Sequence, residues 1–217
     1  MLLAGQGISS VSRKWIMGLS GLFLCIFLLG HLAGNLILLS GEGAKESFNQ
    51  YAQFMRINTF ARVIRYITYF GILFHILYAI GLSIRKRTDN SPKYVYQSPA
   101  IKKTERKARI MPVLGAFIFV FLVIHLRSFW FKASFVGVYD LHGEVIMAFQ
   151  NIYYVVFYVF AMLFLAYHLI HGMKSGIRSL GLVNAEKAYF FKVSIIGFSV
   201  CVPVLYSAIP VFIYIYY

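Results

Sequence analysis

The polarity pattern divides the chain into five long apolar runs separated by polar segments. The runs cover approximately residues 15–39, 61–84, 109–131, 152–173 and 191–215. A helix needs about 20 residues to cross the hydrocarbon layer of a bilayer, so each run is long enough for one transmembrane helix. Lipid cannot satisfy backbone polar groups, and the runs lack the alternation of a β-barrel. The pattern therefore predicts an all-α fold, an integral membrane bundle of five transmembrane helices that forms a single domain over residues 1–217.

The composition agrees with a membrane protein and argues against a soluble one. Hydrophobic residues make up 60% of the 217 positions and charged residues 13%, whereas soluble domains carry about 25% charged residues. The net charge of +14 raises the question of nucleic acid, but the lysines and arginines gather between the apolar runs. Basic residues flank membrane helices in the same way. We therefore expect no nucleic-acid partner.

The distribution of positive charge also predicts which way the helices run. The most basic segment, RKRTDNSPKYVYQSPAIKKTERKAR, follows the second run, and the N-terminus and the segment after the fourth run are basic as well. The two remaining polar segments carry more balanced charge. Because positively charged loops stay on the cytoplasmic side, we expect a multi-pass protein with a cytoplasmic N-terminus and an external C-terminus.

The two cysteines, Cys25 and Cys201, both fall inside apolar runs. They offer neither a disulfide framework nor a CxxC metal site, and the sequence has no CxxCH motif for covalent haem attachment. Any haem in this protein is therefore expected to bind without a covalent link.

Four of the six histidines lie inside the first four runs, one in each: His31, His75, His125 and His168. An ionisable side chain at membrane depth is costly, so such residues usually face the interior of a bundle and mark function. By their positions in the runs, His31 and His125 belong to the external half of the membrane, and His75 and His168 to the cytoplasmic half. With a rise of about 1.5 Å per residue, the two layers lie roughly 10–15 Å apart. Two imidazoles from different helices in each layer are what bis-histidine ligation of haem requires.

Three of these histidines have a glycine one turn away, where a small residue leaves room for a flat macrocycle: Gly34 near His31, Gly71 near His75 and Gly172 near His168. The alternative is that these glycines allow close packing between membrane helices. Likewise, each histidine taken alone is compatible with a satisfied polar residue at a helix contact. Zinc is a weaker alternative to haem, because no cysteine or carboxylate lies at those depths.

The other two histidines carry different expectations. His171 shares a helix face with His168, one turn nearer the cytoplasm, and is expected to contact a haem propionate or a lipid headgroup. His142 lies in the polar segment after the third run and is expected to be a solvated surface residue.

Four segments around these histidines resemble a known family: SRKWIMGLSGLFLCIFLLGHLAGN, FHILYAIGLSIRKR, VIHL and HLIHGMKSGIRSLG. Together they look like the dihaem cytochrome b membrane anchor of succinate:quinone oxidoreductase, a family that includes the anchor of quinol:fumarate reductase. The resemblance covers nearly the whole chain, in the number of spans, the order of the histidines and the character of the loops.

The resemblance implies a membrane anchor and electron-transfer subunit of succinate dehydrogenase in a bacterial cytoplasmic (inner) membrane. It implies two b haems, one held by His75 and His168 near the cytoplasmic side and one by His31 and His125 near the external side. It also implies a flavoprotein subunit with FAD and an iron–sulfur subunit on the cytoplasmic face, with oligomerisation of the whole complex left open. Electrons would pass between these subunits and a membrane quinone, usually menaquinone in this family.

A quinone that exchanges electrons and protons needs hydrogen-bonding groups beside a lipid-facing cavity. The segment GEGAKESFNQYAQF is interpreted as an external loop above the external haem, and its polar side chains are the expected quinone site: Glu46, Asn49, Gln50 and Tyr51. A solvated loop is the alternative. Basic residues at the cytoplasmic ends of the runs are expected to pair with haem propionates: Arg13, Lys14, Lys174 and Arg178.

Three other functions stay open beside succinate dehydrogenase. The first is the anchor of a quinol:fumarate reductase. The second is the cytochrome b subunit of a hydrogenase or formate dehydrogenase, in which the order and spacing of the histidines differ. The third is a haem-free transporter or structural membrane protein, which predicts a colourless purified chain.

Overall fold

The computed structural model describes residues 9–88 and 99–217, and within these ranges every regular element is a helix. The α-helices are α1 (Ser10–Leu36), α2 (Ala44–Ile57), α3 (Thr59–Thr88), α4 (Pro99–His125), α5 (Leu141–Phe149), α6 (Ile152–Ser179) and α7 (Ala188–Tyr216). Short irregular helices continue two of them: the 3-10 helix η1 (Ile37–Leu39) after α1, and the π-helical η2 (Leu126–Trp130) and η3 (Lys132–Val136) after α4.

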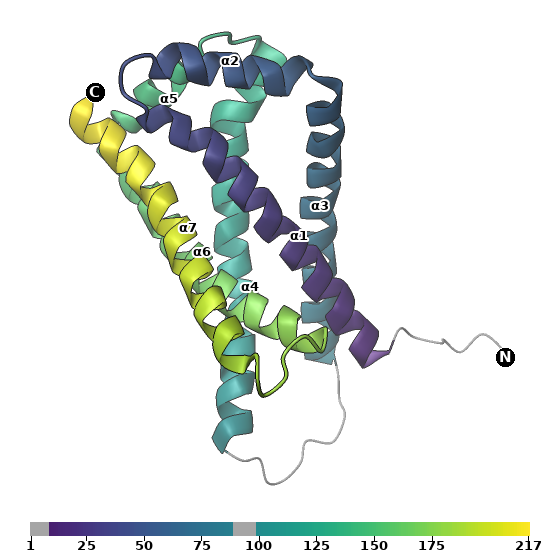
Figure 1. Ribbon diagram of the computed structural model, residues 1–217. Coiled ribbons are helices and arrows are strands. Elements are labelled where there is room, and N and C mark those ends of the chain that lie inside the picture. The colour runs from purple at the N-terminus through teal and green to yellow at the C-terminus, as the bar shows by residue number, and fades with distance from the viewer. Residues whose placement is uncertain (1–8, 89–98) are drawn as a thin grey trace, which may run out of the picture.

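Five helical stretches of the described chain are long and apolar enough to cross a membrane: Val11–Leu39, Thr59–Arg85, Ile110–Val136, Ile152–Ser179 and Ala188–Tyr216. Each contains or closely matches one of the predicted apolar runs, so the prediction of an all-α chain with five such helices is confirmed. In Figure 1 α1 begins at the lower end of the bundle and α7 ends at the upper end. We use "upper end" below for the end that carries α2 and α5, and "lower end" for the opposite one.

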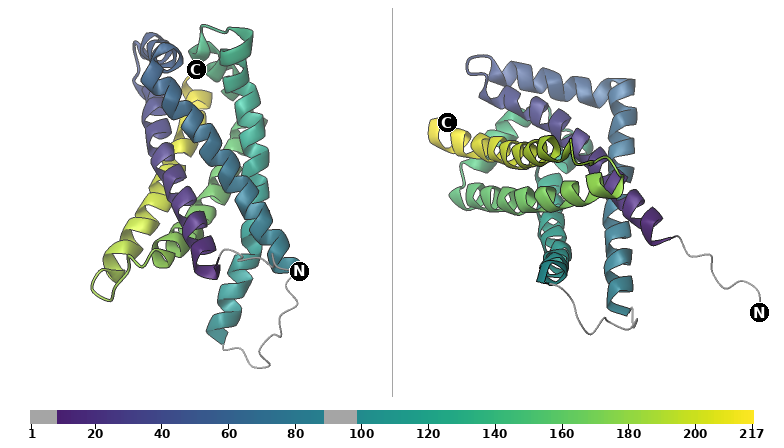
Figure 2. Two further views of the ribbon diagram at one scale, coloured as in Figure 1. Left: turned by 90° about the vertical axis from the view of Figure 1, so that its right-hand side faces the viewer. Right: turned by 60° about the horizontal axis from the view of Figure 1, so that its bottom comes forward.

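Three of the spanning helices, α1, α6 and α7, pack closely. Figures 1 and 2 both show α6 and α7 side by side, and α1 crosses them diagonally. A Cβ atom added to Gly18 on α1 would lie 3.0 Å from the Cα atom of Gly176 on α6. The two backbones can approach this closely because neither residue carries a side chain. This crossing, near the lower end, fixes α1 against α6.

The two helices α3 and α4 present more of their apolar surface outward. Only 6% of the most apolar window of each is buried inside the described structure, compared with 33% for α7. Their exposed side chains are large and apolar, as expected for surfaces that contact lipid or another subunit.

Two short helices, α2 and α5, cover the upper end of the bundle (Figure 1). The sequence interpretation of the segment after the first run as a loop was wrong, because most of it forms α2. Gly43 turns the chain into this helix with a φ of 85°, a conformation that favours glycine. Ala44 and Phe48, one turn apart, are 2% and 5% exposed. The helix forms because these apolar side chains can be buried against the bundle while its polar face stays outside.

Candidate functional site

The four histidines of the spanning helices form two pairs. His31 on α1 and His125 at the end of α4 have ring centroids 5.7 Å apart, with ring planes at 87°. His75 on α3 and His168 on α6 have ring centroids 6.4 Å apart, with planes at 69°. We call the first pair with its surroundings the upper site and the second the lower site. The structure thus brings together the same partners that the sequence pairs by depth.

The vertical order of the pairs can be followed on two helices. Ser20 on α1 contacts His75 and lies eleven residues before His31. On α6, Tyr158 contacts His125 and lies ten residues before His168. Both helices therefore separate the two sites by about 15 Å along their axes, which agrees with the expected layers.

Aromatic side chains enclose the upper site. The ring of Phe27 stacks on His31 at 5.4 Å, and Phe121 stacks on His125 at 5.6 Å. Tyr206 on α7 lies 5.9 Å from the His31 ring, but its hydroxyl donates to the carbonyl oxygen of Leu28 at 2.7 Å. The imidazoles therefore meet in an environment that is apolar apart from a few hydroxyl groups and the amide of Asn35, 3.4 Å from the Nδ1 atom of His31.

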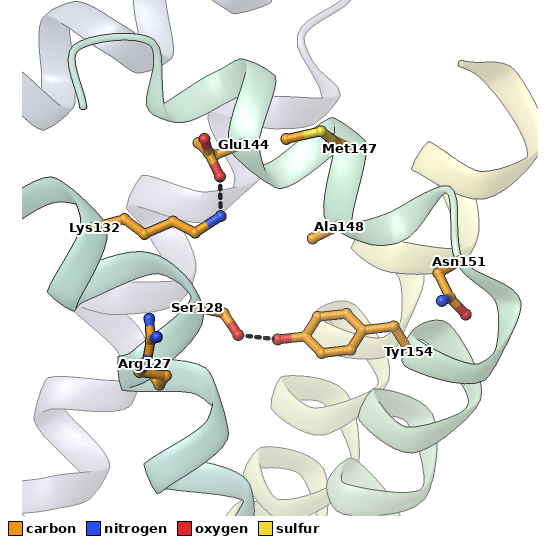
Figure 3. A pocket seen from close by; sticks show the side chains of 8 residues that line it. All are labelled: Arg127, Ser128, Lys132, Glu144, Met147, Ala148, Asn151 and Tyr154. Carbon is orange, nitrogen blue, oxygen red and sulfur yellow. Dashed lines mark hydrogen bonds and ion pairs between the residues drawn. The ribbon is translucent and has the colours of Figure 1, made fainter. Parts of the chain in front are cut away.

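A chain of hydrogen bonds leads from the upper site toward the upper end of the bundle. The Nδ1 atom of His125 lies 3.2 Å from the hydroxyl of Tyr158, which lies 3.3 Å from the hydroxyl of Tyr154. Tyr154 donates to the Oγ atom of Ser128 at 2.5 Å, and Ser128 donates to the carbonyl oxygen of Ile124 at 2.8 Å. Ser128 and Tyr154 also line a cavity of about 350 Å³ beside the ion pair of Lys132 and Glu144, drawn in Figure 3.

The lower site has fewer polar contacts. The Nδ1 atom of His75 lies 3.0 Å from the hydroxyl of Ser20, which donates to the carbonyl oxygen of Met17 at 3.1 Å. The Nδ1 atom of His168 is buried without a hydrogen-bond partner in the described part of the chain. A buried polar atom without a partner is costly, so it suggests that a further group completes this site.

The spacing of the rings is compatible with two ligands of one metal ion, although separations of about 4.5–7 Å are also usual for aromatic pairs. Because a bond between a first-row metal and an imidazole nitrogen is about 2.0–2.1 Å long, two imidazoles on opposite sides of one metal have ring centres roughly 6 Å apart. The observed separations of 5.7 and 6.4 Å lie on either side of that value. Within residues 9–88 and 99–217, no group of three or more His, Cys, Asp or Glu side chains is placed to hold a metal ion. A haem supplies four ring nitrogens itself and needs only two axial ligands, so the residues fit this group.

The three glycines near the histidines differ in their surroundings. A Cβ atom added to Gly34 would overlap the ring of Tyr51, and one added to Gly71 would overlap the ring of Phe23. At Gly172 no described atom lies within 4 Å of such a Cβ. Gly34 and Gly71 therefore receive aromatic rings from neighbouring helices, as in close helix packing, and Gly172 has open space beside it.

The residues expected to bind quinone lie on α2 and make different contacts. Glu46 and Gln50 are exposed, whereas the ring of Tyr51 packs on Gly34 below. The amide of Asn49 donates to Asp140 at 2.9 Å and accepts from the backbone N–H of His142 at 3.0 Å. Asn49 therefore ties α2 to the beginning of α5.

Asp140 makes most of the polar contacts that join α2 to α5. It accepts from Asn49, from the backbone N–H of Gly143 at 3.0 Å, and forms an ion pair with Lys45 at 3.0 Å. These contacts, in that order, hold the pKa of Asp140 well below its ordinary value. As the N-cap of α5, the carboxylate also stabilises the first turn of that helix.

The expectation that His142 is a solvated surface residue was wrong. Its side chain is 6% exposed and its ring lies 6.4 Å from Phe48 and 5.9 Å from Tyr217. Its Nε2 atom has no hydrogen-bond partner in the described residues. Burial lowers the pKa of His142. The sequence missed this position because the covering helices α2 and α5 were not foreseen.

The predicted basic residues gather at the lower end. Arg13 and Lys14 lie in the first turn of α1, and Lys174 and Arg178 lie in the last turns of α6, beyond His171. Lys14, Lys174 and Arg178 are exposed.

Sequence reasoning missed the hydroxyl groups beside the histidines, chiefly Ser20, Tyr154 and Tyr158. The available signal was a polar atom within an apolar run, since such atoms need a partner in lipid. Comparisons of the chain with protein-family models, with curated proteins and with solved structures find no match.

Proposed function

We propose that this chain is a dihaem cytochrome b that anchors a succinate dehydrogenase in a bacterial cytoplasmic membrane and carries electrons to a membrane quinone. The observation that supports it most is the pairing of four histidines from four spanning helices, with ring separations of 5.7 and 6.4 Å. Two pairs in two layers match a function that moves electrons part of the way across a membrane.

Each bound haem would supply a one-electron carrier, and the protein would supply its two axial nitrogens. His31 and His125 would hold one haem in the upper site, and His75 and His168 the other in the lower site. The aromatic rings around the upper pair exclude water, which raises the strength of electrostatic interactions there. Helix packing holds the imidazoles in register, because each pair joins two different helices.

The distribution of charge supports an orientation with the lower end in the cytoplasm. Arg13, Lys14, Lys174 and Arg178 all lie there, as expected for the cytoplasmic ends of membrane helices. A flavoprotein and an iron–sulfur subunit would dock on this basic end and exchange electrons with the lower haem. The quinone, with menaquinone as the expected species, would react near the upper site.

A redox difference spectrum of the purified protein tests the proposal. We expect a b-type spectrum with two haems per chain. Replacing His31 or His125 with alanine should remove one haem, and replacing His75 or His168 should remove the other. His171→Gln, one turn from His168, removes an imidazole but keeps a hydrogen-bonding side chain for a propionate; as the control it should retain both haems. A colourless wild-type protein would contradict the proposal.

The partner subunits decide between the related functions. Purification through a tag on this chain should recover a flavin-bearing subunit, and succinate should then reduce both haems. Reduction by hydrogen or formate but not by succinate would point to the hydrogenase or formate dehydrogenase alternative.

A further inference from the structure

One histidine of each pair has its Nδ1 atom within hydrogen-bond distance of a hydroxyl on a neighbouring helix. In the upper site the hydroxyl belongs to Tyr158 on α6, 3.2 Å from His125. In the lower site it belongs to Ser20 on α1, 3.0 Å from His75. The two contacts come from different helices and residue types, yet they meet the same ring nitrogen.

Counting donors constrains the direction of the hydrogen bonds in the upper site, since each hydroxyl has one hydrogen. Ser128 gives its hydrogen to the carbonyl of Ile124, and Tyr154 gives its hydrogen to Ser128. The hydroxyl oxygen of Tyr154 is left as an acceptor for Tyr158 at 3.3 Å. The oxygen of Tyr158 can then accept from His125, and it does so when Nε2 of that imidazole binds a metal, because the proton of the neutral ring is then on Nδ1.

The same count applies to the lower site. The hydroxyl hydrogen of Ser20 goes to the carbonyl oxygen of Met17 at 3.1 Å. Its oxygen is then free to accept from the Nδ1–H of His75, which is the tautomer that leaves Nε2 to bind a metal.

The second histidine of each pair has no such hydroxyl partner on a neighbouring helix in the described structure. The Nδ1 atom of His168 is buried with no hydrogen bond in the described structure. The amide nitrogen of Asn35, on the same helix, lies 3.4 and 3.5 Å from the ring nitrogens of His31 and also donates to the carbonyl oxygen of His31 at 2.8 Å. Each pair thus has one imidazole with a hydroxyl partner on a neighbouring helix and one without.

We propose that Tyr158 and Ser20 are positioning residues that fix the tautomer and orientation of His125 and His75, and so tune the two haems separately. This inference rests on the proposed dihaem function. A ligating histidine that donates its other N–H becomes a more basic ligand. A more basic ligand stabilises the oxidised metal, so each hydrogen bond lowers the reduction potential of the haem in its own site.

The test compares Tyr158→Phe and Ser20→Ala in the complete complex with the wild type. Tyr158→Phe should raise the potential of the upper haem, with a roughly tenfold change in its oxidised-to-reduced ratio, equivalent to about 59 mV for one electron. Ser20→Ala should raise the potential of the lower haem by a similar amount. Each variant should also change the low-spin ferric electron paramagnetic resonance signal of its own haem, because an imidazole without its hydrogen bond can rotate.

Tyr206→Phe is the matched control. Tyr206 also stands beside an imidazole of the upper site, at 5.9 Å from His31, but its hydroxyl donates to the backbone of Leu28. This variant should leave both potentials and both signals unchanged. A second variant, Tyr154→Phe, should shift the upper haem by less than Tyr158→Phe, since it removes only the next link of the chain.

The results separate the two proposals. A wild-type complex without haem would overturn the proposed function. A complex with two haems in which Tyr158→Phe moves neither haem, or moves both equally, would overturn the positioning role while leaving the dihaem function intact. If Tyr158→Phe lost only the upper haem, the positioning role would be supported, because partners of metal ligands contribute about 10–100-fold to metal affinity.

Discussion

The upper and lower sites are built from similar histidine pairs but are held in different ways. The upper pair is surrounded by aromatic rings and lies beneath α2 and α5, with a chain of hydroxyl groups that ends on the backbone of α4. The lower pair has the single hydroxyl of Ser20 and lies close to the crossing of α1 and α6 at Gly18 and Gly176. The upper site therefore depends on its covering helices, and the lower site depends on a contact between two helix backbones.

The largest effect is expected from widening the crossing of α1 and α6. Gly18→Val would place a branched side chain against the backbone of Gly176, which cannot move aside as a side chain can. We expect the free energy of unfolding to fall by about 1–3 kcal/mol, nearer the larger value. The lower haem should be lost before the upper one. Thermal unfolding and haem content measure both effects.

Gly197→Ala on α7, outside both sites, is the control for this substitution. Its added methyl group would meet no described atom within 4 Å, so stability should change little. If Gly18→Val removed the upper haem first, the assignment of the crossing to the lower site would be wrong.

A smaller effect is expected from breaking the tie between the covering helices. Asn49→Ala removes the hydrogen bonds to Asp140 and to the backbone N–H of His142. Leaving partly buried partners unsatisfied costs about 1–3 kcal/mol. The potential and occupancy of the upper haem should change while those of the lower haem stay constant, as measured by redox titration. Gln50→Ala, an exposed neighbour on α2, should change neither haem.

A still smaller effect is expected at Gly34. A methyl group on this residue would overlap the ring of Tyr51, and that ring can turn aside at a cost of about 1 kcal/mol. Gly34→Ala should therefore disturb the upper site alone, visible as a change in its haem spectrum. The double variant Gly34→Ala with Tyr51→Ala should restore the wild-type spectrum, and failure to restore it would exclude a steric cause.

The smallest effect is expected in the pH dependence of the stability of the covering helices α2 and α5. Burial lowers the pKa of His142, and this outweighs the carboxylates of Asp140 and Glu46, which raise it; Lys45 also lowers it. The neutral imidazole is thus favoured in the fold, so the stabilisation is complete above the ordinary histidine pKa of about 6.5. It is lost progressively as the pH falls from that value toward the lowered pKa of the folded state.

Hydrogen exchange of α2 and α5 between pH 7 and pH 5 measures this dependence. After correction for the intrinsic exchange rate, which itself falls with pH, protection of both helices should decrease at the lower pH in the wild type and change less in His142→Phe. Asp140 contributes stability in a separate, lower pH range. Because its pKa is lowered in the fold, this stabilisation is lost only as the pH falls below the ordinary aspartate pKa. Equal pH dependence in both proteins would show that His142 does not set it.

The sequence alone determined the five spanning helices and the number of candidate ligands. A transmembrane run is a local property, because about 20 consecutive apolar residues suffice to cross the bilayer. The histidines stood out for the same reason, since each is a polar atom in a stretch that otherwise avoids them. Depth then paired His31 with His125 and His75 with His168 without any knowledge of packing.

Only the tertiary structure decided how those histidines are supported. Ser20 lies 55 residues from His75 and Tyr158 lies 33 residues from His125, so neither contact follows from periodicity. The covering helix α2 was mistaken for a loop because its apolar positions are few and gain their stability only against the bundle. The buried state of His142 follows from the same packing. The local pattern of apolar residues predicts which side chains along a single helix avoid water. A hydrogen bond between helices depends instead on how those helices cross.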